Sequence, residues 1–446
     1  MAAMEIEVLS KDYVKPLTPT PSHLRTYKFS LFDQLVPSAH IPIVVFYDRP
    51  TAFSTKEAMR RLKSSVSEAL PDFYPFAGRI MDNLYIDCND AGIYYVEAKV
   101  NCSVRELIGK PDIQLTRKLL PAEPDDSSSE GGTHIAMVQV NEFACGGIAL
   151  AAYLSHKIID GPTLVTLLKA WSHTARGHPQ EVKPSFIRPT IFPQCDKLSP
   201  DYILGIWPSA LKVGKCVTRR FVFSAEAVAT IKARAASPSF VAHPTRIESV
   251  SAFIWKCCMR VTEAKEGSRK PSILSHVINL RGKANDESPI PEHTIGNLLW
   301  VMTARSDQEA DRELQSLVGV LRAGFLGINI ELFEQFAGEN GASKMQECLD
   351  AMSKVYEDEE TDYFGFSSLV NMGTYETDFG WGKPMWVSPG GIDGEIYQNL
   401  VFLIDTRKKG GIEAWTTLGE QDMALLEADQ ELLSLASLES SPLELM

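Results

Sequence analysis

The segment that most constrains the fold of this chain is the unbroken apolar run from Ile148 to Leu154. Gly146 and Gly147 stand directly before it, and the polar residue Ser155 follows it. A short apolar run with such limits is typical of a strand that is covered on both faces. The chain therefore needs a layered α/β core built around this strand.

Apolar periodicity predicts further strands and helices on both sides of this run. In the first half we expect two more strands, at residues 40–47 and 134–143, and two helices, at residues 55–70 and 163–171. We also expect a hairpin at residues 81–100 that turns at residues 89–92. In the second half we expect two strands, at residues 219–224 and 273–281, and two helices, at residues 225–236 and 245–261.

A proline-rich stretch divides the chain into two parts. Residues 184–215 have no regular periodicity, which is typical of a crossover between domains. We therefore predict an N-terminal domain at residues 1–190, a linker at 191–215 and a C-terminal domain at 216–446. Because neither part alternates strand and helix regularly, we expect mixed or antiparallel sheets. Glu123 to Gly132 is acidic and Ser-rich, and predicts an exposed loop.

Composition excludes several classes of protein. The net charge of −13 argues against a nucleic-acid binder and against binding to anionic membranes, since both need a basic face. Eight cysteines are scattered without a CxxC pair, so we predict no zinc site, no disulfide framework and a cytoplasmic location. No apolar run is long enough for a signal peptide or a membrane span.

His156 and Asp160 follow the apolar strand directly, at a strand-to-loop junction where catalytic groups are often held. Their spacing alone favours a base and its orienting carboxylate. The pair is short enough to occur by chance, and a structural histidine is the alternative. No third residue at ligand spacing supports a metal site, and there is no GxSxG, GxGxxG or GKS/GKT motif.

A second motif, DFGWG, covers Asp378 to Gly382 and by itself predicts a glycine-flanked turn. Together with HxxxD it resembles the plant BAHD family, whose members transfer an acyl group from a CoA thioester to an alcohol or amine. The resemblance covers nearly the whole chain, and within the family it is most similar to the branch that holds salutaridinol acetyltransferase and vinorine synthase. The other shared strings are LFDQL, YPFAGR, SHKIIDGPT, TRIESVSAFIWK, VINLRGK and GIEAWTTLGEQDM.

The resemblance implies a fold of two similar chloramphenicol-acetyltransferase-like α/β domains with mixed sheets and a channel between them, in a monomer. It makes His156 the general base, which fits the chemistry, because an alcohol needs a base to take its proton, whereas a thiolate leaves with little protonation. No acyl-enzyme is then required. The family pairs Asp160 with Arg281 as a structural contact, and we follow the family here. The DFGWG loop is likewise structural, with Asp378, Gly380, Trp381 and Gly382 as its named residues.

For the cosubstrate, acetyl-CoA, the resemblance indicates Ser251 and Asn297. A basic run at Arg407, Lys408 and Lys409 is a candidate for the CoA phosphates, with a solvated turn as the alternative. We expect no permanently bound cofactor. The donor is predicted to be acetyl-CoA, although the sequence leaves longer acyl groups open.

The acceptor side carries a departure from the family pattern. Ser367 is a candidate oxyanion donor. Leu369 stands where a Trp is usual, which predicts a wider acceptor pocket and a polycyclic alcohol such as an alkaloid; the alternative is that Leu369 is a core residue. Phe32 is a second candidate for the pocket wall. Other open readings are a volatile alcohol or acylsugar acceptor, a hydrolase, a metal-dependent phosphoesterase and a catalytically silent binding protein.

Overall fold

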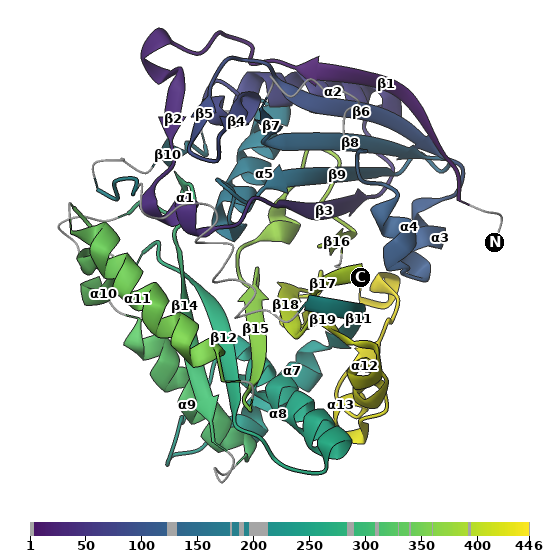
Figure 1. Ribbon diagram of the computed structural model, residues 1–446. Helices are drawn as coiled ribbons and strands as arrows, with labels where there is room; N and C mark the ends of the chain where they lie inside the picture. Colours follow the sequence, from purple (N-terminus) through teal and green to yellow (C-terminus); the bar gives the residue numbers. More distant parts are fainter. Residues whose placement is uncertain are drawn as a thin grey trace.

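The computed structural model of the chain describes residues 4–122, 132–178, 181–186, 191–195, 213–282, 290–307, 312–328, 330–338, 340–358, 360–390 and 394–445. These residues form two lobes, each built on a mixed sheet, with the first half of the chain above the second in Figure 1. The predicted exposed loop at residues 123–132 lies almost wholly outside the described residues, as does most of the predicted linker.

The first lobe is built on a sheet of six described strands. Their spatial order is β1 (Ile6–Val14), β6 (Ile93–Val100), β8 (Ala136–Phe143), β9 (Ile148–Ser155), β3 (His40–Tyr47) and β16 (Trp386–Ser388). Only β6 and β8 run parallel to each other. Strand β9 lies between two neighbours, and every residue in it except Tyr153 is buried. The prediction of a strand covered on both faces is therefore confirmed.

Helices of the first lobe begin at side-chain caps that the sequence provides. The described helices are α1 (Leu31–Leu35), α2 (Thr55–Ala69), α3 (Val104–Gly109), α4 (Ile113–Arg117) and α5 (Gly161–Ala175). Ser54 caps α2 by accepting a hydrogen bond from the backbone N–H of Glu57, at 3.2 Å. Helices α2 and α5 contact each other behind the sheet in Figure 1. The two predicted helices are thus present.

The second lobe holds the larger sheet. Its order is β14 (Leu299–Ser306), β12 (Ser272–Asn279), β15 (Asp362–Ser368), β18 (Leu400–Asp405), β19 (Ile412–Gly419), β11 (Val213–Phe223) and β17 (Gly394–Tyr397), with β20 (Ser437–Leu438) paired to β11. Its described helices are α7 (Ala225–Ala235), α8 (Arg246–Glu266), α9 (Leu314–Gly327), α10 (Ile330–Gln335), α11 (Gly341–Tyr356), α12 (Glu420–Glu427) and α13 (Gln430–Leu433).

Short elements complete the described chain. A small sheet has the order β2 (Thr26–Lys28), β5 (Tyr85–Asp87), β4 (Arg79–Met81) and β7 (Thr133–His134). The 3-10 helices are η1 (Ser22–Leu24), η2 (Tyr74–Ala77), η3 (Thr374–Glu376) and η4 (Pro442–Leu445). The predicted hairpin at residues 81–100 is wrong, because β5 pairs with β4 and β2 whereas β6 joins the large first sheet.

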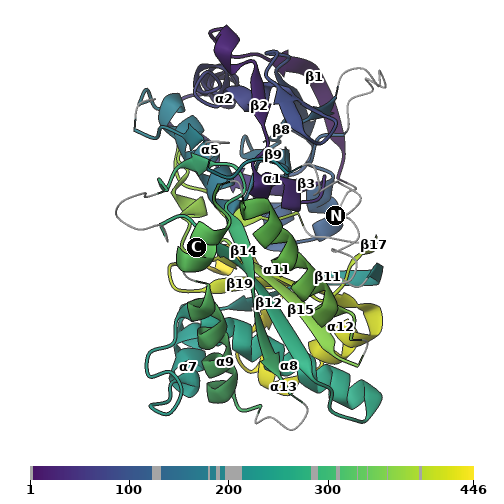
Figure 2. The ribbon, with the colours of Figure 1, turned by 60° about the vertical axis from the view of Figure 1, so that its left-hand side comes forward.

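Several segments tie the two lobes together. Strand β16 comes late in the chain yet pairs with β3 at the edge of the first sheet. Strand β10 (Ser185–Phe186) pairs in parallel with β13 (Thr294–Ile295). At the junction, α1 lies above α11 and β14 in Figures 1 and 2, and the buried residues of these elements share one apolar cluster. None of the described helices is long and apolar enough to cross a membrane.

Candidate active site

His156 stands directly after β9, and its backbone is held from both lobes. Its N–H donates to the carbonyl of Ala39 in the first lobe, at 2.8 Å. Its own carbonyl accepts a hydrogen bond from Nδ2 of Asn297, at 2.8 Å. Asn297 precedes β14 of the second lobe. The residue predicted as the base therefore lies at the junction between the two sheets.

The ring of His156 is suited to accept a proton. Its Nδ1 atom is buried and has no hydrogen-bond partner among the described residues. Burial lowers the pKa of His156 below its usual 6.5, outweighing the raising effects of its own backbone, of Asp160 and of the Asn297 side chain. The imidazole is consequently neutral at pH 7, which is the state that a general base requires.

Asp160 does not hold the His156 ring. Its two carboxylate oxygens accept hydrogen bonds from the Arg281 guanidinium, at 2.7 and 3.1 Å. They also accept from the backbone N–H groups of Thr163, at 2.9 Å, and of Leu298, at 3.1 Å. The bond from Thr163 makes Asp160 the N-cap of α5. The side chains of Asp160 and Arg281 are 4% and 1% exposed. The contact implied by the family resemblance is present, and the orienting contact favoured by spacing alone is absent.

Sequence reasoning missed a second buried carboxylate in this region. Asp33 on α1 is fully buried, and its Oδ1 accepts from both the backbone N–H and Nδ2 of Asn297, at 2.7 and 3.1 Å. The neighbouring Lys157 donates to the carbonyl of Val36, at 2.9 Å, and burial lowers the pKa of this lysine to about 8. The only signal for Asp33 was its place in the LFDQL string.

Asn297 was predicted to contact CoA, but its side chain lies beneath the His156 loop. It is 0% exposed and its amide nitrogen is shared between Asp33 and His156. Ser251, the other predicted CoA residue, lies on α8 and is also 0% exposed, and its hydroxyl has no hydrogen-bond partner among the described residues. A CoA contact at either residue would require neighbouring atoms to move, and stays a prediction.

The DFGWG loop packs against the first lobe. Oδ1 of Asp378 accepts from the backbone N–H groups of Gly380 and Gly382, at 2.8 and 2.9 Å. Both glycines have positive φ, +104° and +115°, which a residue with a side chain rarely adopts. Trp381 packs edge-on against the ring of Tyr47 at the end of β3, with 6.0 Å between the ring centroids. The predicted turn is confirmed, and its described contacts link the lobes.

The predicted acceptor residues lie in different surroundings. Ser367 is partly exposed near the end of β15. Leu369 is 5% exposed and belongs to the first lobe's core, where its side chain lies next to Gly161; a Cβ on that glycine would come within 2.5 Å of it. This placement favours the alternative that Leu369 is a core residue. Phe32 is fully buried against Phe192 and Phe336.

Arg407 and Lys408 occupy the turn between β18 and β19. Lys408 is exposed, and its ammonium lies 3.7 Å from a carboxylate oxygen of Glu226, which is also exposed. Arg407 contributes to lowering the pKa of Asp48, though less than Arg105, which donates a hydrogen bond to Asp48 at 2.6 Å. The turn thus lies near the end of β3, where positive charge from both lobes gathers.

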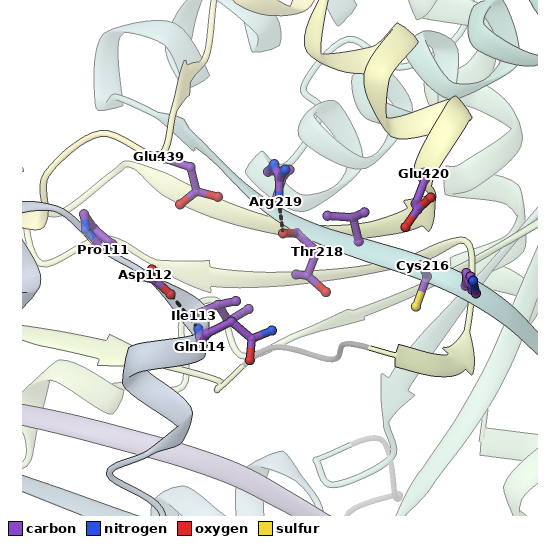
Figure 3. Close-up of a pocket in the computed structure, with 11 residues that line it drawn as sticks. Pro111, Asp112, Ile113, Gln114, Cys216, Thr218, Arg219, Glu420 and Glu439 are labelled. Carbon is purple, nitrogen blue, oxygen red and sulfur yellow. Dashed lines mark hydrogen bonds between the residues drawn. The ribbon is translucent and has the colours of Figure 1, made fainter. Parts of the chain in front are cut away.

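One groove of about 690 Å³ opens between α4 and the start of β11 (Figure 3). Its lining includes Asp112, Lys215, Arg219 and Glu439, and none of the predicted site residues. Its lining contains no histidine, and two of its charged groups have partners, because Arg219 pairs with Glu427 and Glu439 with Arg220. Within the described part of the chain, no three His, Cys, Asp or Glu side chains form a metal-binding group.

Comparison with known proteins assigns the chain to a family. A family model described as the Transferase family matches residues 4–433. Limonoid 7-O-acetyltransferase of Citrus sinensis is 40% identical, over 99% of this chain and all of that protein. Vinorine synthase of Rauvolfia serpentina is 34% identical over 97% of this chain and 98% of its own.

Solved structures agree with this assignment. The crystal structure of vinorine synthase matches with a TM-score of 0.80 at 32% identity, over 97% of this chain and 99% of that one. An F. sporotrichioides protein complexed with coenzyme A and T-2 shares the fold alone, with a TM-score of 0.64 at 17% identity, over 93% of this chain and all of that one. The chain therefore belongs to the BAHD branch of the Transferase family and is an acyltransferase with the vinorine synthase-like α/β fold.

Proposed function

We propose that this protein transfers an acetyl group from acetyl-CoA to a hydroxyl of a polycyclic plant metabolite, with His156 as general base. The observation that carries the proposal is the neutral imidazole of the half-buried His156, held at the junction of the lobes, with a buried Nδ1 that has no hydrogen-bond partner among the described residues. A neutral ring there can take the hydroxyl proton as the oxygen attacks the thioester carbonyl. The proton then resides on His156 and the attack forms the new C–O bond.

The tetrahedral intermediate collapses by breaking the C–S bond. The CoA thiolate leaves without prior protonation, because a free thiol has a pKa of about 8.5, and it then takes the proton from His156. Ser367 supports the intermediate as an oxyanion donor, since its hydroxyl lies at the partly exposed end of β15. Both substrates must be bound together, so no acyl-enzyme forms.

The acyl donor would contact the basic turn. Arg407 and Lys408 offer positive charge to the CoA phosphates beside Asp48 and Arg105, in a chain whose net charge is −13. Ser251 supports the same assignment because its buried hydroxyl has no hydrogen-bond partner in the described part of the chain. We further propose a cytoplasmic monomer with domains at residues 1–190 and 216–446 joined by the linker at 191–215, and a channel between them.

The acceptor class rests on the relatives and on the residues near α1. One relative is named as a limonoid 7-O-acetyltransferase and another as a stemmadenine O-acetyltransferase, and their matches cover 99% and 96% of this chain. Phe32, Phe192 and Trp300 belong to one buried apolar cluster next to Asp33, so an acceptor bound at this end of the junction would have an apolar wall behind it.

The test is product formation with purified protein and acetyl-CoA. We would offer limonoid alcohols, indole-alkaloid alcohols, a benzyl alcohol and a sugar, and follow acetylation by mass spectrometry. The proposal expects acetylated polycyclic product with wild type and at least a 100-fold lower rate with His156→Ala. Acetylation of the benzyl alcohol or sugar alone would overturn the acceptor class. Consumption of acetyl-CoA without any acceptor would indicate a hydrolase instead.

A further inference from the structure

The buried carboxylate of Asp33 serves two neighbours with its two oxygens. Oδ2 accepts from the backbone N–H and the hydroxyl of Ser30, at 3.0 and 2.7 Å, and so closes the capping box that begins α1. Oδ1 accepts from the backbone N–H and Nδ2 of Asn297. Asp33 forms no ion pair within the described residues. Burial raises the pKa of Asp33, and the hydrogen bonds from Ser30 and Asn297 lower it again in part, so these bonds offset some of the cost of burying the carboxylate.

Asn297 passes this restraint to His156. Its Nδ2 donates to Asp33 and to the His156 carbonyl, and these two acceptors fix the plane of the amide. With the N–H of His156 bonded to Ala39, the peptide groups on both sides of the His156 Cα are anchored. At the ring, Nδ1 has no hydrogen bond of good geometry among the described residues, but the Asn297 side chain lies close enough to raise the pKa of His156.

This arrangement differs from a base held by a carboxylate on its ring. In such a triad the orienting hydrogen bond reaches the imidazole itself. Here the nearest motif carboxylate, Asp160, is occupied by Arg281, Thr163 and Leu298. The direction of the ring therefore comes from its backbone, its packing and the Asn297 side chain, which also acts on the imidazole, so the groups that hold Asn297 and the backbone take over the orienting task.

We propose that Asp33 is a positioning residue for the acyl transfer, acting through Asn297 on the backbone of His156. The inference rests on the proposed function, since it assigns to His156 the role of base. It also gives Asn297 a different task from the CoA contact that the family resemblance implied. Asp33 comes from the first lobe and Asn297 from the second, so the link also ties the backbone of His156 to both lobes.

The first test separates positioning from CoA binding by comparing kcat with KM. In Asn297→Ala we expect kcat to fall about 10- to 100-fold, since a small misplacement of a reacting group can cost about 100-fold in rate. KM for acetyl-CoA and for the acceptor should stay within about twofold. A raised KM for acetyl-CoA with an unchanged kcat would overturn the proposal and restore the CoA contact.

The matched control is Ser30→Ala, which removes hydroxyl bonds on the other side of the same carboxylate. It should lower the melting temperature and leave kcat within about twofold of wild type. An equal loss of kcat in Ser30→Ala and Asn297→Ala, at a temperature where both are folded, would attribute the effect to general destabilisation and overturn the proposal. This comparison decides even where a substitution at Asp33 fails to fold.

The second test is a double-mutant cycle with Asp33→Asn and Asn297→Ala. If Asp33 acts through Asn297, the double variant should lose no more kcat than the worse of the two single variants. Losses of kcat that multiply would refute the link. Wild type must turn over acetyl-CoA and acceptor in the same assay; if it does not, the proposed function fails, whereas active wild type with an unaffected Asn297→Ala refutes only this inference.

Discussion

Asp160→Ala should lower the stability of the fold, because Asp160 holds structural contacts and does not touch the reacting atoms. The substitution leaves the Arg281 guanidinium, whose side chain is 1% exposed, without its charged partner, which typically costs about 3–5 kcal/mol. Loss of the α5 cap at Thr163 adds about 1 kcal/mol. The stranded N–H of Leu298 adds about 1–3 kcal/mol. These effects share one side chain and do not add fully, so we expect a loss of about 4–8 kcal/mol.

Unfolding in urea, followed by tryptophan fluorescence, measures this loss against an ordinary stability of about 5–15 kcal/mol. Asp160→Asn keeps the size of the side chain and removes its charge, so it should also lower the urea midpoint. Adding Arg281→Met to Asp160→Asn should raise the midpoint again, because the unpaired charge is gone. An Asp160→Asn variant with a wild-type midpoint and a kcat reduced 1,000-fold or more would refute this reasoning and favour an orienting role for Asp160.

Four further outcomes are expected. His156→Ala should lower kcat by about 10²–10⁴ with little change in melting temperature. The kcat/KM of wild type should fall with acidification only below about pH 6.5, because burial lowers the pKa of this histidine. A decrease of kcat/KM with acidification that begins above pH 7 would contradict this. His276 is buried, and burial lowers its pKa to about 4, so the unfolded state binds more protons between pH 6.5 and 4. The free energy of unfolding should therefore fall by up to about 3 kcal/mol as the pH is lowered across that window. A His276→Gln variant with the same acid dependence in urea titrations would disprove this. Leu369→Trp should destabilise the fold by about 1–3 kcal/mol through crowding at Gly161, and a loss of kcat/KM on bulky acceptors alone, without destabilisation, would restore the pocket-wall role. Steady-state kinetics should show a ternary complex, and isolation of acetylated protein after mixing with acetyl-CoA alone would argue for ping-pong exchange.

Patterns local in sequence gave most of the elements correctly. Helix α8 carries a cap at Thr245 and a left-handed glycine at Gly267, so both of its ends follow from nearby residues. Strand pairing was less accessible. The segment at 81–100 contains the turn residues of a hairpin, yet β6 pairs with β8, some forty residues further along. The partner of a strand depends on which sheet has an edge free to pair with it. This information is set by the whole fold, and a short stretch of sequence does not carry it.

The sequence by itself determined the buried strand, the helix that follows it and the place of His156 between them, because apolar periodicity, caps and motif spacing act within about twenty residues. Tertiary structure alone decided what holds His156 and its neighbours. Asp160 meets a guanidinium 121 residues away, and Asp33 meets an amide 264 residues away. Such contacts are set by how the two lobes pack. In the unfolded chain water satisfies a carboxylate, and only when burial excludes water does the carboxylate depend on one particular donor from a distant part of the sequence.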